Sequence, residues 1–345
     1  MEKKITLQDI AKTANVTVAT VHKALYNKKG VSPKKREEIL ALAHSMNYYI
    51  ESPTANKTYK IAAVFPEPTN DNRYFYQYIW NGIHSRAKEL ASCHMEIIDF
   101  PFDGGQEQQE QLLNHIWERE RQELSGLLTV VWNGAESLYV LSKFTDEDIP
   151  VFTLSSDAPF SQSTSCIMVN PYRSGRLAAE YLGSILRQPC RVVIIGTKRD
   201  TNNHAQIVRG FFDQMTESNP SIEIIELYEN VYYPKKLFDT LSEFLQTIDN
   251  ILGIYANNAR TTARVCNMVK EIGYQDKVTI VGSELFDESK DALKHGILNA
   301  IIDQNGYEQG YKGVSMVFES VVLGNDIPKK NEINASLILK NNLPL

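Results

Sequence analysis

Nine short apolar runs, arranged in two series, constrain the fold of residues 60–330 more than any other feature of this sequence. Each run carries apolar side chains at consecutive positions and is followed by a helix-like or loop segment. Strands that are apolar on both faces and alternate with helices form parallel sheets covered on both sides. The runs are residues 60–65, 95–100, 126–131 and 149–154 in the first series, and 191–196, 222–227, 251–256, 278–282 and 297–303 in the second. We therefore predict an α/β core of two doubly wound parallel-sheet subdomains, with a cleft where strand C-termini converge.

Polar and aromatic side chains follow these predicted strands at their C-terminal ends. Trp132 and Asn133 follow the third strand, and Ser155, Ser156 and Asp157 follow the fourth. Aromatic rings can stack on the faces of sugar rings, and amides can pair with hydroxyl groups as donors and as acceptors. Any one of these residues is equally compatible with an ordinary loop. Together they favour a cleft that binds a polyhydroxylated ligand.

The bulk composition is typical of a globular protein of two or three domains. The chain has 345 residues, of which 43% are hydrophobic and 23% charged. The longest apolar runs are too short to span a bilayer, and the N-terminus lacks the apolar core of a signal peptide. The four cysteines are widely spaced and form no CxxC or Cys/His cluster. We expect buried, reduced thiols, a cytoplasmic protein with no membrane contact, and no metal or cofactor.

The charges are distributed unevenly along the chain. Residues 1–60 hold eleven Lys/Arg and five Asp/Glu and carry a net charge of +6, whereas the remainder carries −12. A basic head on an acidic body indicates that only the head meets a polyanion such as nucleic acid. Charge alone is equally compatible with an ordinary solvated lysine surface, so the local sequence of the head has to decide.

Two of the helices expected in the head have clear terminal signals. Thr6 can cap a helix over residues 7–14, and Asn15 tolerates the left-handed conformation that a tight exit turn needs. Ser32 followed by Pro33 is an N-cap and first-turn pair for a helix that continues to Met46.

The segment between these helices, residues 16–25 (VTVATVHKAL), is ambiguous. Its alternating start is typical of a strand, but no partner strand or hairpin signal lies nearby. As a helix it places Val21, Ala24 and Leu25 on one side and leaves Val18 and Ala19 on another. We therefore predict helix, tight turn and helix, with the second helix presenting a small exposed N-terminal face. Helix-turn-helix proteins place this face in the major groove of DNA.

This headpiece resembles that of the lac-repressor (LacI) family of bacterial transcription regulators. The resemblance lies in LQDIAKTANVTVATVHKAL and in GVSPKKREEILALAHSMNY. The residues that match the family pattern are Leu7, Asp9, Ile10, Ala11, Ala14, Val16, Thr20, Val21, Leu25, Gly30, Val31, Ser32, Arg36 and Tyr48. Asn15 replaces a turn glycine, His22 a serine and Tyr26 an asparagine, which suggests an unusual operator preference.

The resemblance implies roles for residues of the second helix. Val18, Ala19 and Lys23 would face base edges, where lysine can donate to guanine and apolar groups can contact a thymine methyl. Other implied or candidate DNA contacts, mainly to phosphates, are Thr17, Thr20, His22, Tyr26, Lys28, Lys29 and Arg36. The alternative for Val18 and Ala19 is a packing role only. The linker lacks the family's A-R-x-L motif, so we expect it to act mainly as a tether.

The body resembles the periplasmic sugar-binding-protein fold of type I, which serves as the sensor core of that family. The motifs are SSDAP, VNPYRSGRLAAEYL, ANNA and IIDQNGYEQGYKG. The ligand contacts that this resemblance implies, with aromatic stacking candidates, are Tyr74, Phe75, Trp132, Ser155, Ser156, Asp157, Asn257, Glu284 and Gln304. Several polar positions depart from the family pattern, so the ligand should differ from the pentose or galactoside of the best-known relatives.

We divide the chain into a DNA-binding headpiece (1–48), a linker (49–59), a ligand-binding and dimerisation core (60–330) and a C-terminal segment (331–345). The expected function is a homodimeric transcription regulator that reads a pseudo-palindromic operator and responds to a sugar or sugar derivative. The alternative is a ligand sensor whose DNA binding is weakly specific or architectural. The sequence contains no G-x-S-x-G, GxxxxGK[ST] or strand-linked GxGxxG motif, so we assign no catalytic residues and expect no enzyme activity.

Overall fold

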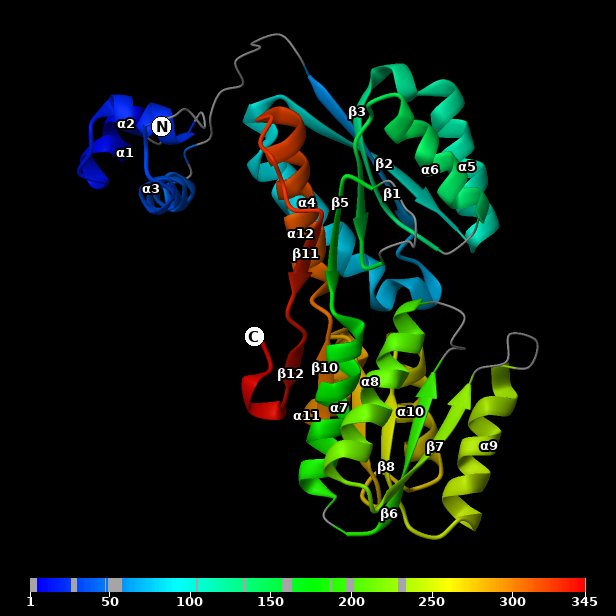
Figure 1. The fold of residues 1–345 in the computed structure, drawn as a ribbon. Helices are drawn as coiled ribbons and strands as arrows, with labels where there is room; N and C mark the ends of the chain where they lie inside the picture. The colour runs from blue at the N-terminus through cyan, green and yellow to red at the C-terminus, as the bar shows by residue number, and fades with distance from the viewer. Residues whose placement is uncertain are drawn as a thin grey trace.

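The structure is a computed structural model of the chain. It describes residues 5–25, 30–46, 48, 58–103, 105–132, 135–156, 163–186, 188–196, 202–228 and 234–344. These residues form a helical headpiece and a core of two α/β subdomains, which stack one above the other in Figure 1. The predicted site residues Tyr26, Lys28, Lys29 and Asp157 lie outside the described residues, as does most of the predicted linker.

The headpiece contains the three predicted helices, α1 (Leu7–Thr13), α2 (Val18–Leu25) and α3 (Pro33–Ser45). Thr6 caps α1 in a reciprocal capping box with Asp9. Asn15 adopts the left-handed conformation with φ 53°, as predicted for the exit turn. The segment that looked strand-like is therefore helical.

Side chains from all three helices form the small core of the headpiece. Ile10, Val21 and Ile39 are fully buried there, one from each helix. Their contacts hold α2 in place although its β-branched residues are poor helix formers.

Subdomain 1 is a six-stranded parallel sheet of order β11-β5-β4-β3-β1-β2. The strands are β1 (Tyr59–Pro66), β2 (Met95–Phe102), β3 (Leu124–Val130), β4 (Val151–Leu154), β5 (Ser165–Val169) and β11 (Lys330–Ile333). Helices α4 (Tyr76–Glu89) and α12 (Gly306–Val317) cover one face, and α5 (Gln106–Arg119) and α6 (Ala135–Asp146) cover the other. Alternate residues of β1 face the two layers, which is why this strand is apolar on both sides.

Subdomain 2 repeats this arrangement with the order β12-β10-β9-β8-β6-β7. The strands are β6 (Cys190–Gly196), β7 (Ile222–Tyr228), β8 (Ile251–Ala256), β9 (Thr279–Ser283), β10 (Ala300–Asp303) and β12 (Ser336–Ile338), the last antiparallel to β10. Helices α7 (Pro171–Ile185) and α8 (Asn202–Ser218) cover one face. Helices α9 (Pro234–Thr247), α10 (Ala259–Glu271) and α11 (Asp287–Lys294) cover the other.

The two sheets share one strand order over their first five strands, β2-β1-β3-β4-β5 and β7-β6-β8-β9-β10. In such sheets a crevice forms at the carboxyl ends of the strands, at the point where the winding reverses. The chain crosses between subdomains three times, from β5 to α7, from β10 to α12 and from β11 to β12. Helix α12 therefore runs from one of these crossings back along subdomain 1 (Figure 1).

All nine predicted strand segments contain a strand, and the two-subdomain fold class is confirmed. Three strands escaped prediction, namely β5, β11 and β12. Strand β11 (KNEI) is mostly polar and β12 has only three residues, so neither shows an apolar run that can be recognised in isolation. Strand β11 is an edge strand of the first sheet and β12 of the second, so part of the C-terminal segment 331–345 belongs to the core.

Each subdomain contains one pair of helices that pack backbone against backbone. A Cβ atom added at Gly310 of α12 would lie 2.2 Å from the carbonyl oxygen of Ile79 in α4. A Cβ atom at Gly210 of α8 would lie 2.0 Å from the carbonyl oxygen of Tyr172 in α7. No side chain fits at these distances, so glycine is required for the helices to approach this closely.

Candidate functional site

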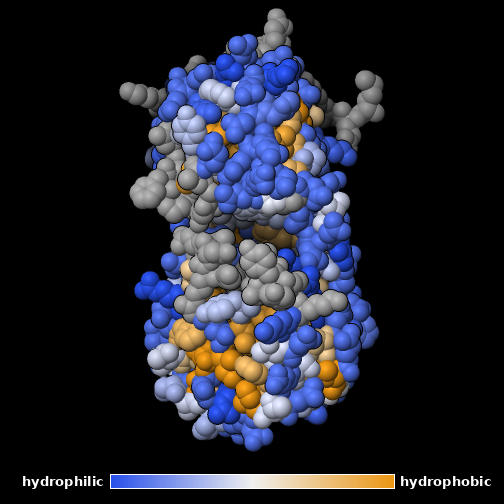
Figure 2. Space-filling view, turned by 90° about the vertical axis from the view of Figure 1, so that its right-hand side faces the viewer, coloured by the Kyte–Doolittle hydropathy of each residue, from blue (hydrophilic) through white to orange (hydrophobic). Residues whose placement is uncertain are grey.

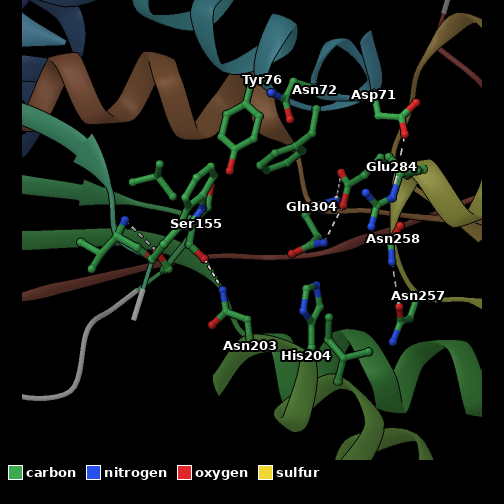
Figure 3. A pocket seen from close by; sticks show the side chains of 18 residues that line it. Asp71, Asn72, Tyr76, Ser155, Asn203, His204, Asn257, Asn258, Glu284 and Gln304 are labelled. Atoms are coloured by element: carbon green, nitrogen blue, oxygen red, sulfur yellow. Dashed lines mark hydrogen bonds and ion pairs between the residues drawn. The ribbon is translucent and has the colours of Figure 1, made fainter. Parts of the chain in front are cut away.

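A cavity of about 380 Å³ lies between the subdomains, at the carboxyl ends of the strands. This volume is within the range of small-molecule sites. It is lined by Asp71, Asn72, Phe75, Tyr76, Val130, Val131, Trp132, Ser155, Ser156, Asn203, His204, Ile207, Asn257, Asn258, Ala259, Arg260, Glu284 and Gln304. Figure 3 shows polar side chains from both subdomains around one space. We call this space the cleft.

The structure brings most of the predicted ligand residues together in the cleft. They are Phe75, Trp132, Ser155, Ser156, Asn257, Glu284 and Gln304. The predicted position of Tyr74 is corrected, because this residue lines a neighbouring cavity and not the cleft. Its ring packs against Phe286 with centroids 4.5 Å apart, and its hydroxyl accepts a hydrogen bond from Arg73 at 2.9 Å. The short 3₁₀ turn that ends at Tyr74 points consecutive side chains to different sides, which the sequence alone did not indicate.

Several cleft residues were not predicted individually. They are Asp71, Asn72, Tyr76, Asn203, His204 and Arg260, together with Asn258. The polar segments that contain them do follow predicted strands, so the sequence indicated which loops would form the cleft but not which of their residues. Which side chain of a loop points inward depends on the backbone turn, which periodicity does not specify.

Subdomain 1 supplies the aromatic side of the cleft. Phe75 and Tyr76 lie with ring centroids 5.4 Å apart, and Trp132 packs edge-on against Phe102. Burial raises the pKa of Tyr76 to about 12, so its phenol stays protonated and can donate a hydrogen bond. Figure 3 shows the Tyr76 hydroxyl and the His204 ring pointing into the cleft from opposite subdomains.

Subdomain 2 supplies an amide pair at the start of α10. Asn258 is the N-cap, and its Oδ1 accepts from the Thr261 amide at 2.9 Å. Its Nδ2 donates to Oδ1 of Asn257 at 3.2 Å, and only 2% of Asn257 is exposed. A Cβ atom at Gly196 would lie 1.7 Å from that same Oδ1. Glycine at the end of β6 therefore makes room for the Asn257 amide.

Charged residues join the two subdomains beside the cleft. The Asp71 carboxylate lies 3.1 Å from Arg264 and 4.0 Å from Arg260, both on α10. Arg73 pairs with Glu288 of α11 at 2.7 Å. All of these side chains are at least one third exposed, so solvent weakens the pairs. They contribute mainly to how the two walls are oriented.

Two neighbouring carboxyls, the buried Glu284 and the half-buried Asp303, lie between the cleft and the β10 to α12 crossing. Glu284 is 4% exposed and accepts hydrogen bonds from the Gln304 side chain at 2.5 Å and from the Gln304 amide at 3.3 Å. Burial, with the nearby Asp303 carboxyl second, raises the pKa of Glu284 well above its ordinary value. Burial also raises the pKa of Asp303. The pair therefore holds a proton to higher pH than an isolated carboxyl would.

The headpiece exposes the face of α2 that the sequence assigned to DNA. Thr17, Val18, Ala19 and Lys23 are exposed, while Thr20 and His22 are half-buried. Val18 is 39% exposed, so its side chain is accessible to a partner of the headpiece. The Thr17 and Thr20 hydroxyls lie 2.9 Å apart and join the first turn of α2.

Two basic residues of α3 make contacts within the headpiece. Arg36 donates from Nη1 to the carbonyl oxygens of Lys23 at 3.2 Å and Ala24 at 3.0 Å, at the C-terminal end of α2. Lys35 pairs with Glu38 at 2.9 Å. Arg36 was predicted as a DNA contact, and in the structure its guanidinium caps the C-terminal end of α2.

The four cysteines are free and buried, as expected from their spacing. Within the described part of the chain, no helix is long and apolar enough to cross a membrane. Within the same part, no group of three or more His, Cys, Asp or Glu side chains could hold a metal ion.

The fold and the two surfaces define a class of protein in which a helix-turn-helix headpiece is joined to a two-subdomain binding core. Residues 6–50 match the lacI family of bacterial regulatory proteins, and residues 62–325 match the periplasmic binding protein domain family. The chain belongs to the periplasmic binding protein domain family through its core, and its headpiece is a DNA-binding domain of the lacI family of bacterial regulatory proteins.

Named relatives agree with this assignment. The regulator DegA of Bacillus subtilis is 26% identical over 64% of this chain, and the match spans 63% of DegA. The repressor PurR of Histophilus somni strain 129Pt is 23% identical over 83% of this chain and 84% of its own length. The glucose-galactose binding protein GanP of Geobacillus stearothermophilus superposes with a TM-score of 0.72 at 26% identity, over 84% of this chain and all of GanP. These relatives are regulators and a binding protein, not enzymes.

Proposed function

We propose that this protein is a transcription regulator whose affinity for a DNA operator is controlled by a small molecule bound in the cleft. One observation carries the proposal: a single chain joins an exposed recognition-helix face to a cleft lined from two subdomains. A ligand that favours one arrangement of the subdomains can change how the headpieces are presented to DNA. Since DNA is the proposed partner, we place the protein in the bacterial cytoplasm.

The proposed DNA contacts follow the exposure of α2. Val18, Ala19 and Lys23 read base edges, with Thr17, Thr20 and His22 closer to the backbone. The test is selection of binding sequences from random DNA with the purified full-length protein. Enrichment of a pseudo-palindrome supports the proposal. Equal binding of selected and random DNA at moderate salt would favour the weakly specific alternative.

A pseudo-palindromic operator requires two headpieces, so we propose a homodimer. The edge strand β7 offers a surface for a second copy, because Ile224, Ile225 and Leu227 are only half-buried and Tyr228 is 46% exposed. Figure 2 shows apolar residues gathered on the lower subdomain in the view toward the β7 and α9 side. An edge strand presents a row of unpaired backbone groups, which favours pairing with another chain. Analytical ultracentrifugation tests this, and a monomer at micromolar concentration would contradict it.

The lining of the cleft favours a neutral sugar. Amide, hydroxyl and aromatic groups dominate it, and the Arg260 guanidinium faces the Asp71 carboxylate. Glu284 adds a further acidic group. A phosphorylated or acidic ligand would meet these carboxyls without a surplus of positive charge, whereas sugar hydroxyls can both donate and accept. The name of GanP, a glucose-galactose binding protein, points to the same class.

The test is a thermal-shift panel of neutral monosaccharides, sugar phosphates, uronic acids and purines. A ligand at 100 times its Kd stabilises the folded state by about 2.7 kcal/mol, which is readily detected. A shift with a neutral sugar alone supports the assignment. A larger shift with a phosphate, a uronic acid or a purine would refute it.

A further inference from the structure

The two subdomains place one strained turn each at equivalent points of the cleft. Ser155 directly follows β4, and Glu284 directly follows β9, the strand with the same place in the second sheet. Both are left-handed, with φ of 64° and 69°. The Ser155 amide donates to Ile167 of β5 at 2.9 Å, and the Glu284 amide donates to Ile302 of β10 at 3.0 Å. Left-handed residues other than glycine are costly and concentrate at functional sites.

A chain of hydrogen bonds connects these two turns. The Ser155 hydroxyl donates to Oε1 of Gln309 at 2.9 Å, and Nε2 of Gln309 donates to the Gln304 carbonyl at 2.8 Å. The Gln304 side chain then donates to the Glu284 carboxyl. On the other side, Asn203 of α8 donates to the Ser155 carbonyl at 2.6 Å. Every member except Gln309 lines the cleft.

Gln309 is the centre of this chain and is held rigidly. Its side chain is fully buried, and both ends of its amide are used. It lies on α12 beside Gly310, whose backbone packs against that of α4. An apolar residue of similar size would fill the space but leave the half-buried Ser155 hydroxyl and the Gln304 carbonyl without this partner. Packing alone would not require a glutamine at this position.

We propose that Gln309 is a positioning residue that couples the two walls of the cleft to each other and to α12. A change at Ser155 is transmitted through Gln309 to Gln304 and Glu284, and the reverse also holds. Since α12 runs from the crossing along subdomain 1, the same contact connects ligand occupancy with the body of that subdomain. The regulatory part of this inference rests on the proposed function, but the coupling itself does not require a ligand.

The direct test is hydrogen–deuterium exchange on the ligand-free, full-length chain. We compare Ser155→Ala, Gln309→Leu and the double variant with the wild type. Ser155→Ala should raise exchange about fivefold at the Glu284 and Gln304 amides, on the far side of Gln309. In the Gln309→Leu background the same Ser155→Ala change should add nothing further. Additive effects, or no change at Glu284 and Gln304, would overturn the proposal.

Gln109 provides a matched control. It is another fully buried glutamine in subdomain 1, on α5, and it donates to the Val130 carbonyl. Gln109→Leu should leave exchange at Glu284 and Gln304 unchanged. If it raises exchange there as much as Gln309→Leu does, the effect is general loosening and the coupling role is wrong. Gln309→Met replaces Gln309→Leu should the latter fail to fold.

A second experiment uses D-glucose, D-galactose, D-arabinose and D-allose as probes in thermal shift and calorimetry. If one of them binds the wild type, Gln309→Leu should weaken it about tenfold and Gln109→Leu should not. Equal weakening by both variants would contradict the coupling. If none binds, the neutral-sugar assignment loses its support, while the exchange experiment still decides the role of Gln309.

Discussion

Gly210→Ala in α8 should destabilise the protein although alanine is the better helix former. In an exposed helix this change stabilises by about 1 kcal/mol. Here the new Cβ would lie 2.0 Å from the Tyr172 carbonyl oxygen of α7, well below a normal contact of about 3.4 Å or more. The helices must separate by more than 1 Å to relieve this overlap. Overpacking of this kind costs about 1–3 kcal/mol. Since the gain in helix propensity offsets about 1 kcal/mol of this cost, we expect a net loss of stability of up to about 2 kcal/mol.

Gly183→Ala is the control in the same helix pair. A Cβ atom there would lie 2.1 Å from the Asn219 Oδ1, almost the same distance as at Gly210. The obstacle is the end of a flexible side chain, which can rotate away and lose one hydrogen bond to the Gly183 carbonyl. The propensity gain and the lost bond are each about 1 kcal/mol, so stability should change by less than about 0.5 kcal/mol.

The assay has to report on subdomain 2. All three tryptophans (Trp80, Trp117 and Trp132) lie in or directly after elements of subdomain 1, so their fluorescence follows the other half of the core. Urea unfolding should therefore be followed by circular dichroism, with hydrogen exchange of α7 and α8 as a local measure. A Gly210→Ala variant as stable as the wild type, or a Gly183→Ala variant equally destabilised, would refute the close-packing argument.

Three further predictions address the site and the headpiece. Arg36→Ala should lower the Tm of the headpiece because it removes the cap on α2, whereas Lys23→Ala should keep the Tm and lose operator specificity. Thermal denaturation measures the first effect and gel shift the second. Unchanged headpiece stability in Arg36→Ala would count against its capping role. Because folding raises the pKa of Glu284, its protonated form adds stability at low pH that is lost as pH rises through the folded pKa. Glu284→Gln should therefore flatten the fall of Tm as pH rises above the ordinary carboxyl range, and an unchanged profile would contradict this. Phe75→Ala should weaken a bound sugar by tenfold or more and Tyr74→Ala should not, as measured by calorimetry, and the reverse order would return Tyr74 to the cleft.

Elements that are specified by residues close together in the chain were predictable, whereas elements that depend on distant contacts were not. Strands such as β1 and β8 were predictable because they are apolar on both faces, and Asn15 because a tight helix exit needs a left-handed residue. Strand β12 has three residues and forms only when β10 is beside it, so its own sequence carries little signal.

The candidate site shows the same division. The sequence indicated the loops that form the cleft, since parallel strands bring their ends together. It did not separate Tyr74 from Phe75, whose directions depend on one 3₁₀ turn. It also did not reveal the cap that Arg36 provides, because that contact requires the packing of α3 against α2.

The three chain crossings have a mechanical consequence for the core. They connect β5 and β11, which lie at one edge of the first sheet, with elements around β10 and β12, at one edge of the second. The opposite edges, β2 and β7, have no direct chain connection to the other subdomain. Two subdomains that are connected along one edge move relative to each other mainly by rotation about a hinge at that edge. A single distance between spin labels placed near β2 and β7 should therefore report the conformation of the whole core.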